Sequence, residues 1–388
     1  MKKRVAYMLV VLAFALNACT PDEAPQPRLY SDPDGFAQVF DSFWTQMSSR
    51  YVYWGLDTTD WNRVYRQYQP RFRQLDIRRA ADVQTSVAYF REMTAGLADG
   101  HFYVQFGAAY FPAPTSINPA FERKQKLPTY RAPSNYRSSV TRYLDVGYQS
   151  GSDVVSAPNQ QVLSTLAGTI GDRILYFSCN YFYLSNAYHA SKDGGNRAVI
   201  AYFFEQLAHL PVGAGGVIID VRGNAGGALA DLNFLVGRFI ESPLHFGYTR
   251  YKAGRDRLEY TPWVKSFVNP VTGSQRLTRP IIVLADQFSA SAAELIAQAI
   301  KTLPSGKMVG ENTYGATGPL AAGEVYDAGS FRVGDFMMVQ TASAAFQGLD
   351  GQSYERHGIA PDVFAPYDPA SLEKGIDTQL EKAISLIP

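Results

Sequence analysis

Hydrophobic positions between residues 35 and 100 recur with the period of an α-helix. Three groups share this spacing: Phe36, Val39, Phe40, Phe43 and Met47; Trp61, Val64, Tyr65 and Tyr68; and Ala81, Val83, Val87, Phe90, Met93 and Leu97. Each group predicts one helix, and the second should end near Pro70, because proline disrupts a helix interior. We therefore interpret residues 35–100 as a small helical cap domain.

The pattern weakens between residues 101 and 170. His101 to Phe106, HFYVQF, predicts a short strand. Residues 107–167 are rich in Pro, Ser, Asn and Tyr and show little periodicity, which indicates long loops with short strands. We interpret 101–170 as a connecting strand and loop region.

From residue 171 onward, apolar strands alternate with helices. Strands are predicted at ILYFSC (174–179), GVIIDV (216–221), PIIVLA (280–285) and KMVG (307–310), and helices at 197–210, 228–240, 291–303 and 371–386. Strands that are apolar along their whole length are typical of a sheet covered on both faces, with mostly parallel pairing. The predicted fold class is therefore α/β: a core domain over 171–388 with a mostly parallel sheet and helices on both faces, joined to the helical cap.

Charge and composition exclude several classes of partner. The 388 residues contain 36 Lys and Arg against 35 Asp and Glu, a net charge of +1, and no run of basic residues interleaved with aromatic ones. Binding to a nucleic acid backbone needs a surplus of positive charge, so nucleic acid is not expected as a partner. No cluster of His, Cys and carboxylates has the spacing of metal ligands, and we expect no metal and no cofactor.

The N-terminus has the order of an export signal. Basic residues at positions 2–4 precede an apolar run, Val5 to Leu16, that is too short to span a bilayer. The run ends in Leu-Asn-Ala-Cys, which resembles a bacterial lipobox, so residues 1–18 are a predicted signal peptide and Cys19 a predicted lipidation site. Residues 19–34, with three prolines between positions 20 and 28, would form a tether. This predicts anchorage through lipid in the cell envelope, on the periplasmic or cell-surface side of a bacterial membrane; an ordinary cleaved signal is the alternative.

Two turns between a strand and a helix could carry chemistry, because ligands of doubly covered sheets lie beyond the carboxyl ends of the strands. The first, DVRGNAGG (220–227), has glycines that free its backbone N–H groups to face an anion, but it lacks the spacing of a phosphate or dinucleotide loop. The second, DQFSASAAE (286–294), puts a serine at the first turn of a helix. The structural alternatives are tight packing of the first turn and simple helix capping by Ser289 or Ser291 in the second.

Together, the two turns resemble the tail-specific or C-terminal processing peptidase family of serine proteases, whose fold is related to the crotonase sheet. VGENTYG (309–315), ERHGIAPD (355–362) and the closing helix extend the resemblance over residues 171–388, and the cap with LADGH (97–101) resembles the bacterial lipoprotein branch. The resemblance implies that Ser291 is the nucleophile. It also implies that the backbone N–H groups of Gly227 and Ala292 form the oxyanion hole.

The general base is predicted from a difference between this chain and one branch of the family. One branch uses a lysine 25 residues after the serine, but here that position is Ala316. The other branch, which includes the tricorn protease core, uses a histidine before the serine domain and a late glutamate. Matching positions imply His101 as the base and Glu355 as its orienting partner, with Gly100 where the tricorn core has a serine. His357 is the alternative base.

Substrate capture is predicted to differ from that of many relatives. These carry a PDZ module between cap and core, but residues 101–170 are too few for a complete one, so the PDZ module is expected to be absent or reduced. The leading functional hypothesis is a lipid-anchored serine endopeptidase acting on peptides or proteins. The alternative is a non-catalytic binding protein of the same fold that holds a hydrophobic ligand or peptide; the oligomeric state is not predicted.

Overall fold

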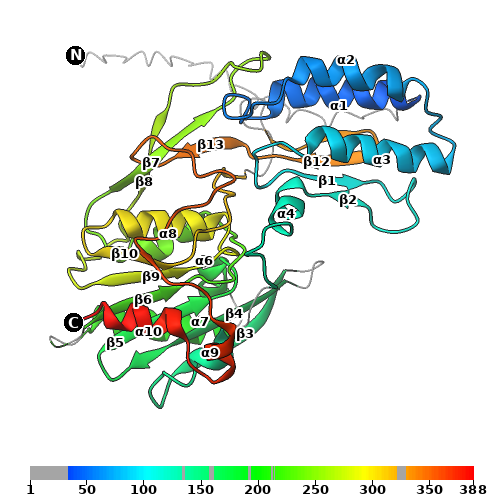
Figure 1. Ribbon diagram of the computed structural model, residues 1–388. Coiled ribbons are helices and arrows are strands. Elements are labelled where there is room, and N and C mark those ends of the chain that lie inside the picture. Colours follow the sequence, from blue (N-terminus) through cyan, green and yellow to red (C-terminus); the bar gives the residue numbers. More distant parts are fainter. Residues whose placement is uncertain are drawn as a thin grey trace, which may run out of the picture.

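The computed structural model describes residues 34–132, 136–156, 161–190, 194–210, 213, 215–320 and 329–388. The predicted signal peptide, Cys19 and nearly all of the predicted tether lie outside these residues. Figure 1 shows the helices α1 to α3 at one end of the molecule and the main sheet at the other. No helix in the described ranges has the length and apolar character needed to cross a bilayer.

The main sheet has seven strands within the described residues. In spatial order they are β14 (Val363–Phe364), β10 (Gly306–Gly310), β9 (Ile281–Ala285), β6 (Gly216–Asp220), β5 (Ile174–Cys179), β4 (Gln161–Ile170) and β3 (Gln149–Ser156). Neighbours from β14 to β5 pair in parallel, whereas β5 with β4 and β4 with β3 pair antiparallel. Every residue of β6 and β9 is buried, as their uninterrupted apolar runs predict.

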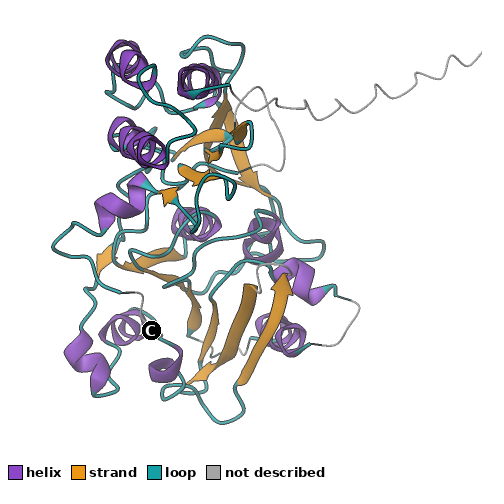
Figure 2. Cartoon of the chain, turned by 90° about the vertical axis from the view of Figure 1, so that its right-hand side faces the viewer, coloured by secondary structure: helices purple, strands orange, loops and turns teal. Residues whose placement is uncertain are grey.

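Helices cover both faces of this sheet, which confirms the predicted fold class (Figure 2). One apolar cluster joins the sheet to α7 (Gly195–Ala208) and α8 (Ala292–Thr302). A second cluster on the other face includes residues of α5 (Arg137–Val140) and α10 (Thr378–Ser385). The shorter helices are α6 (Leu184–Tyr188) and α9 (Pro369–Glu373).

The helical cap shares its core with a small sheet from both ends of the chain. Helices α1 (Phe36–Arg50), α2 (Trp61–Phe72) and α3 (Ala80–Thr94) form where periodicity predicts them, and α2 runs two residues past Pro70. The sheet has the order β11 (Phe331–Val333), β12 (Met337–Gln340), β1 (Tyr103–Phe106) and β2 (Ser116–Ile117). Its apolar residues lie in the same buried cluster as those of the helices, so the cap core includes residues from late in the sequence.

The region predicted as connecting strands and loops contributes more regular structure than its composition indicated. Strands β3 and β4 form the antiparallel edge of the main sheet, which therefore begins before residue 171. Between them and β1 lie β2, α5 and α4 (Pro119–Lys124), a short helix capped by Asn118. Ser, Pro and Asn are frequent in the surrounding loops, and they made the hydrophobic pattern of β3 and β4 difficult to recognise in the sequence.

One predicted helix, 228–240, is wrong in extent. A π-helix covers only Leu232–Val236. Gly237 ends it in a turn, where the backbone packs so closely on the carbonyl oxygens of Asn233 and Asn269 that a Cβ would not fit. Strands β7 (Leu244–Tyr251), β8 (Val264–Val268) and β13 (Ala344–Gln347) then form a third sheet in the order β13, β7, β8.

Candidate active site

Two loops at the carboxyl ends of β6 and β9 pack directly against each other. The backbone N–H of Ala290 donates to the carbonyl of Asn224 at 2.9 Å, and the hydroxyl of Ser289 donates to the carbonyl of Val221 at 2.7 Å. Gly226 has φ = 97°, and a Cβ there would lie 2.6 Å from the Cβ of Ser291. Only glycine fits this position, because the GNAGG loop lies against Ser291 itself.

Ser291 and Ser289 occupy different environments. Ser291 is partly exposed and is the N-cap residue of α8, with φ = 57° and ψ = −122°. This conformation is unfavourable for a residue with a side chain and is typical of a serine presented on a sharp turn between strand and helix. Ser289 is fully buried, and its hydroxyl bonds within the loops. The accessible serine of the SAS sequence is therefore Ser291.

The N–H groups of Gly227 and Ala292 form no hydrogen bond with any described residue. The neighbouring N–H of Gly226, by contrast, donates to Oδ1 of Asn224 at 2.8 Å. The position of a Cβ on Gly226 would be 3.0 Å from the nitrogen of Ala292, so the glycine loop and the first turn of α8 meet beside Ser291. Two free N–H groups at this place can stabilise a developing oxyanion.

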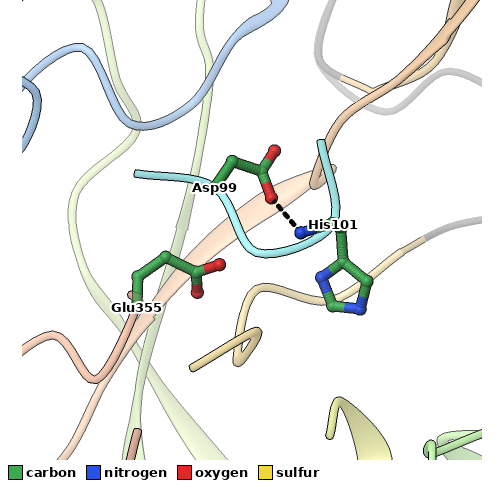
Figure 3. Close-up of side chains that lie close together, drawn as sticks. All are labelled: Asp99, His101 and Glu355. Atoms are coloured by element: carbon green, nitrogen blue, oxygen red, sulfur yellow. Dashed lines mark hydrogen bonds between the residues drawn. The ribbon is translucent and has the colours of Figure 1, made fainter. Parts of the chain in front are cut away.

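His101 lies in a turn that the buried carboxylate of Asp99 fixes. Oδ1 of Asp99 accepts the N–H of His101 at 2.8 Å, as Figure 3 shows, and Oδ2 accepts hydrogen bonds from Thr341 and Ala342. The imidazole is partly exposed, but its Nδ1 is buried and has no hydrogen-bond partner in the described part of the chain. A neutral imidazole with one unengaged nitrogen is able to accept a proton.

Glu355 is buried near His101 but forms no direct hydrogen bond with it. Its Oε1 accepts the N–H of Gly100 at 2.6 Å, and its Oε2 accepts the hydroxyl of Tyr53 at 2.9 Å. The same Oε2 accepts the N–H groups of Thr317 and Gly318 and the Thr317 hydroxyl. A carboxyl oxygen of Glu355 lies within 4.8 Å of a ring nitrogen of His101, and the carboxyl group directly holds the peptide that precedes His101.

The segment 313–318 connects the serine turn to the histidine turn. Glu294, fully buried in α8, accepts the N–H groups of Ser291, Gly315 and Ala316. The backbone of Gly100 packs on the same segment, where a Cβ would lie 2.6 Å from the Cβ of Ala316. Two buried glutamates, Glu294 and Glu355, therefore hold opposite ends of one segment between Ser291 and His101.

Burial shifts the pKa values of His101 and Glu355. It lowers the pKa of His101, although the negative charge of Asp99 acts in the opposite direction. Burial and the charge of Asp99 raise the pKa of Glu355 to about 8, against the effect of the hydrogen bonds from Gly100 and Tyr53. At neutral pH, His101 is therefore in its neutral, proton-accepting form.

Asp99, His101 and Glu355 also form a group whose ligand atoms lie within 4.8 Å of one another, as a metal ion would require. However, each oxygen of both carboxyl groups already accepts at least one N–H or O–H group. Donor hydrogens directed at these oxygens would oppose a cation. The geometry fits a hydrogen-bonded acid and base group better than it fits a metal centre.

His357, the position of the other branch's lysine and the two lysines between the motifs lie in different surroundings from His101. Ala316 is buried and has no titratable side chain. Lys301 pairs with Asp362 at 2.9 Å, and Lys307 is exposed on β10. His357 is exposed beside Asn312, outside the group of Asp99, His101 and Glu355.

The site includes residues that sequence reasoning missed. Tyr53 makes the contact described above and lies in no motif, whereas Asp99 and Glu294 lie within LADGH and DQFSASAAE without having been assigned a role. The Asp99 of LADGH, two residues before the candidate base, was the available signal. Arg222 pairs with Asp220 at 2.6 Å and also with Asp377, and Cys179 is a buried free thiol.

Comparison with known proteins finds the same family that the sequence motifs indicated. Residues 184–364 match the model of peptidase family S41. The carboxy-terminal processing protease CtpA of Bacillus subtilis is 29% identical over 153 residues, 39% of this chain and 29% of that protein. Tricorn protease homolog 1 of Streptomyces coelicolor is 29% identical over 176 residues, 44% of this chain and 14% of its own length. The chain thus spans less than a third of the length of either relative.

A solved structure shows the same fold over nearly the whole chain. A candidate peptidase from Parabacteroides merdae superposes with a TM-score of 0.67 and 21% identity, covering 91% of this chain and 97% of its own. The paired turns, the fold and the family match agree, and the resemblance to the tail-specific and C-terminal processing peptidases is confirmed: residues 184–364, just under half of the chain, match peptidase family S41.

Proposed function

We propose that this protein is a lipid-anchored serine endopeptidase that hydrolyses peptide bonds through an acyl-enzyme. The observation that carries the proposal is the strained, partly exposed Ser291 packed on the GNAGG loop beside two unengaged N–H groups. Strain of this kind is retained where function requires it. A buried structural serine, such as Ser289, would need neither the strain nor the free donors.

In the proposed reaction, His101 accepts the proton of the Ser291 hydroxyl while the serine oxygen attacks the scissile carbonyl. The carbonyl oxygen becomes an oxyanion that accepts hydrogen bonds from Gly227 and Ala292. The protonated His101 then gives its proton to the leaving amine, which departs as the C–N bond breaks. Water, activated by the same histidine, hydrolyses the ester and regenerates Ser291. Glu355 acts as a positioning residue, since it holds the Gly100 peptide beside the base.

A fluorophosphonate probe tests this proposal against the alternative of a non-catalytic binding protein. The probe reacts with activated serines, so the full chain should be labelled covalently at one serine and should also cleave a quenched fluorescent peptide library. A binding protein of the same fold would give neither result. Heat-denatured protein is the control, because its serines are no longer activated.

The pH dependence of turnover should show two ionisations. Activity rises with pH as His101 loses its proton, and its lowered pKa places this step below pH 6.5. Ionisation of Glu355, near pH 8, adds negative charge beside the forming imidazolium, so activity should rise again. The measurement is kcat/KM from pH 4.5 to 9.5 for the wild type and Glu355→Gln, which should lose only the upper step. An unchanged upper step in Glu355→Gln would contradict this role.

The proposed anchorage depends on Cys19. Metabolic labelling with a fatty acid should mark the wild-type protein and place it in the membrane fraction. Cys19→Ala should lose the label and appear in the soluble fraction, because one thiol is the acceptor for the lipid. Label retained by Cys19→Ala would show that the lipobox interpretation is wrong, whereas the peptidase proposal would be unaffected.

A further inference from the structure

Helix α2 and the turn that follows it present a group of arginines to solvent. Residues 61–79 contain six arginines, no lysine and a single acidic residue, Asp76. All six arginines are exposed, and together they form what we call the arginine face of the cap: Arg63, Arg66, Arg71, Arg73, Arg78 and Arg79. Because the whole chain has a net charge of only +1, this local surplus of positive charge leaves the rest of the chain net negative.

The packing of α2 explains why the arginines collect on one side. Trp61 and Phe72 are fully buried in the core of the cap. Arg63, Arg66 and Arg73 are spaced by three and then seven residues, which places them together on the opposite side of the helix. No acidic residue occurs between positions 61 and 75. α2 lies on the outer side of the cap, away from the main sheet, so this side of the helix is open to a partner (Figure 1).

Neighbouring carboxylates neutralise only part of this charge. Arg63, Arg73 and Arg79 form no ion pair with any carboxylate in the described part of the chain. Ion pairs between exposed side chains are weak and are screened by salt. The arginine face therefore keeps a positive potential. Its three ion pairs join Arg66 to Asp60 at 3.8 Å, Arg71 to Glu92 at 3.9 Å and Arg78 to Asp76 at 2.9 Å.

The chain enters the fold beside this surface. The ring of Phe36, the first residue of α1, lies 6.3 Å from the ring of Phe72, the last residue of α2. Fourteen residues, 20–33, separate Cys19 from Asp34, and a segment of this length reaches at most about 50 Å when fully extended. A lipid on Cys19 would therefore keep the arginine face within a short distance of the bilayer.

We propose that the arginine face docks on the anionic phosphate headgroups of the membrane that holds the lipid anchor. The inference rests on the proposed anchorage through Cys19 and adds the orientation of the protein on the bilayer. Arginine suits this partner, because its planar guanidinium can donate two parallel hydrogen bonds to one phosphate. The anchor already confines the chain to the surface, so a weak attraction is sufficient to orient it.

This orientation has a consequence for the candidate active site. The main sheet lies at the other end of the molecule from α2, and Ser291 follows one of its strands (Figure 1). The net negative remainder of the chain would be repelled by the same headgroups that attract the arginine face. Ser291 would thus be held away from the bilayer, and substrates would reach it from the aqueous side.

Vesicle sedimentation tests the surface without the lipid. A chain of residues 20–388 keeps every described residue but lacks Cys19 and the predicted signal peptide. It should bind vesicles of phosphatidylcholine mixed with phosphatidylglycerol and should not bind vesicles of phosphatidylcholine alone. Raising the NaCl concentration from about 0.05 M to 0.5 M should abolish binding, because salt screens the attraction. Equal binding to both kinds of vesicle, or to neither, would overturn the inference.

Variants that remove charge locate the binding surface. The triple variant Arg63→Gln, Arg66→Gln, Arg73→Gln should bind anionic vesicles about 100-fold more weakly, since each basic residue near an anionic surface contributes roughly fivefold. Its melting temperature should stay close to that of the wild type, because the three side chains are exposed. Equal losses in this variant and in the control would show that net charge alone determines binding, contrary to the proposal. The matched control removes three exposed positive charges outside the cap and should bind like the wild type: Lys265→Gln, Arg276→Gln, Lys307→Gln.

Energy transfer measures the orientation of the acylated protein. Cys179 is buried, so a thiol-reactive dye can be directed to Gln67→Cys on α2 or to Lys307→Cys on β10, both at exposed positions. In proteoliposomes with an acceptor on the lipid headgroups, the dye on α2 should be quenched more strongly than the dye on β10. The triple variant should reduce this difference. A difference of the same size in the wild type and the triple variant would show that the tether alone sets the orientation, and the docking surface would be rejected.

The outcomes separate this inference from the proposed function. Binding of residues 20–388 to anionic vesicles, with no fatty-acid label on the full chain, would contradict the anchorage alone. A label on Cys19 without any preference for anionic vesicles would contradict the docking surface alone. Tighter binding of residues 20–388 to a single-stranded RNA than to anionic vesicles at the same salt concentration would assign the arginine face to a nucleic acid and refute the membrane as its partner.

Discussion

Ser291→Ala should lose fluorophosphonate labelling completely and should lower kcat by about 10⁴-fold to 10⁶-fold, the range found when a serine nucleophile is removed. The hydroxyl is partly exposed, and the backbone N–H of Ser291 keeps its bond to Glu294 in the variant. The melting temperature should therefore change little. Labelling by the probe, peptide turnover and a thermal denaturation curve together check this expectation.

Ser289→Ala is the matched control and should give the opposite result. Its buried hydroxyl joins Asp286 to Val221, so its removal should reduce the free energy of unfolding by about 1–3 kcal/mol, while the folded protein still reacts with the probe. Labelling that moves to Ser289 would show that the wrong serine of the SAS sequence has been assigned.

His101→Ala should produce the second large loss, a decrease in kcat of about 10³-fold or more, because a serine hydroxyl at neutral pH needs a proton acceptor. KM should change far less than kcat if the imidazole acts on the proton and not in substrate binding. The control is His209→Ala, an exposed residue at the end of α7 whose loss should leave both constants unchanged. The assignment of the base would be wrong if His357→Ala abolished turnover and His101→Ala did not.

The sequence predicted those parts of the fold and site that depend on local patterns. The apolar runs of β6 and β9 and the glycine and serine turns that follow them lie within short segments, so their structure could be inferred directly. The helices α1 to α3 likewise follow from one periodic face each. The family match confirmed what these motifs indicated.

The partners of Glu355 could not be predicted, because they are distant in the chain. Tyr53 is 302 residues away and Gly100 is 255 residues away. The small sheet of the cap was missed for the same reason: β1 pairs with β12, which lies late in the core domain, and neither strand has a long periodic pattern. Glu355 lies in a turn beside Arg356, and no local feature of this turn indicates its contacts with Tyr53 and Gly100.

This long-range pairing determines when a newly synthesised chain can become active. β1 begins two residues after His101 and pairs with β12, and both β12 and Glu355 are made late. The turn that carries His101 is held by hydrogen bonds of Asp99 with Thr341 and Ala342 and of Gly100 with Glu355. These bonds cannot form until nearly the whole chain has left the ribosome. Closing so long a loop is among the slow steps of folding. In the proposed peptidase, an incomplete or unfolded chain would hold no assembled base and would therefore be unable to cleave peptides.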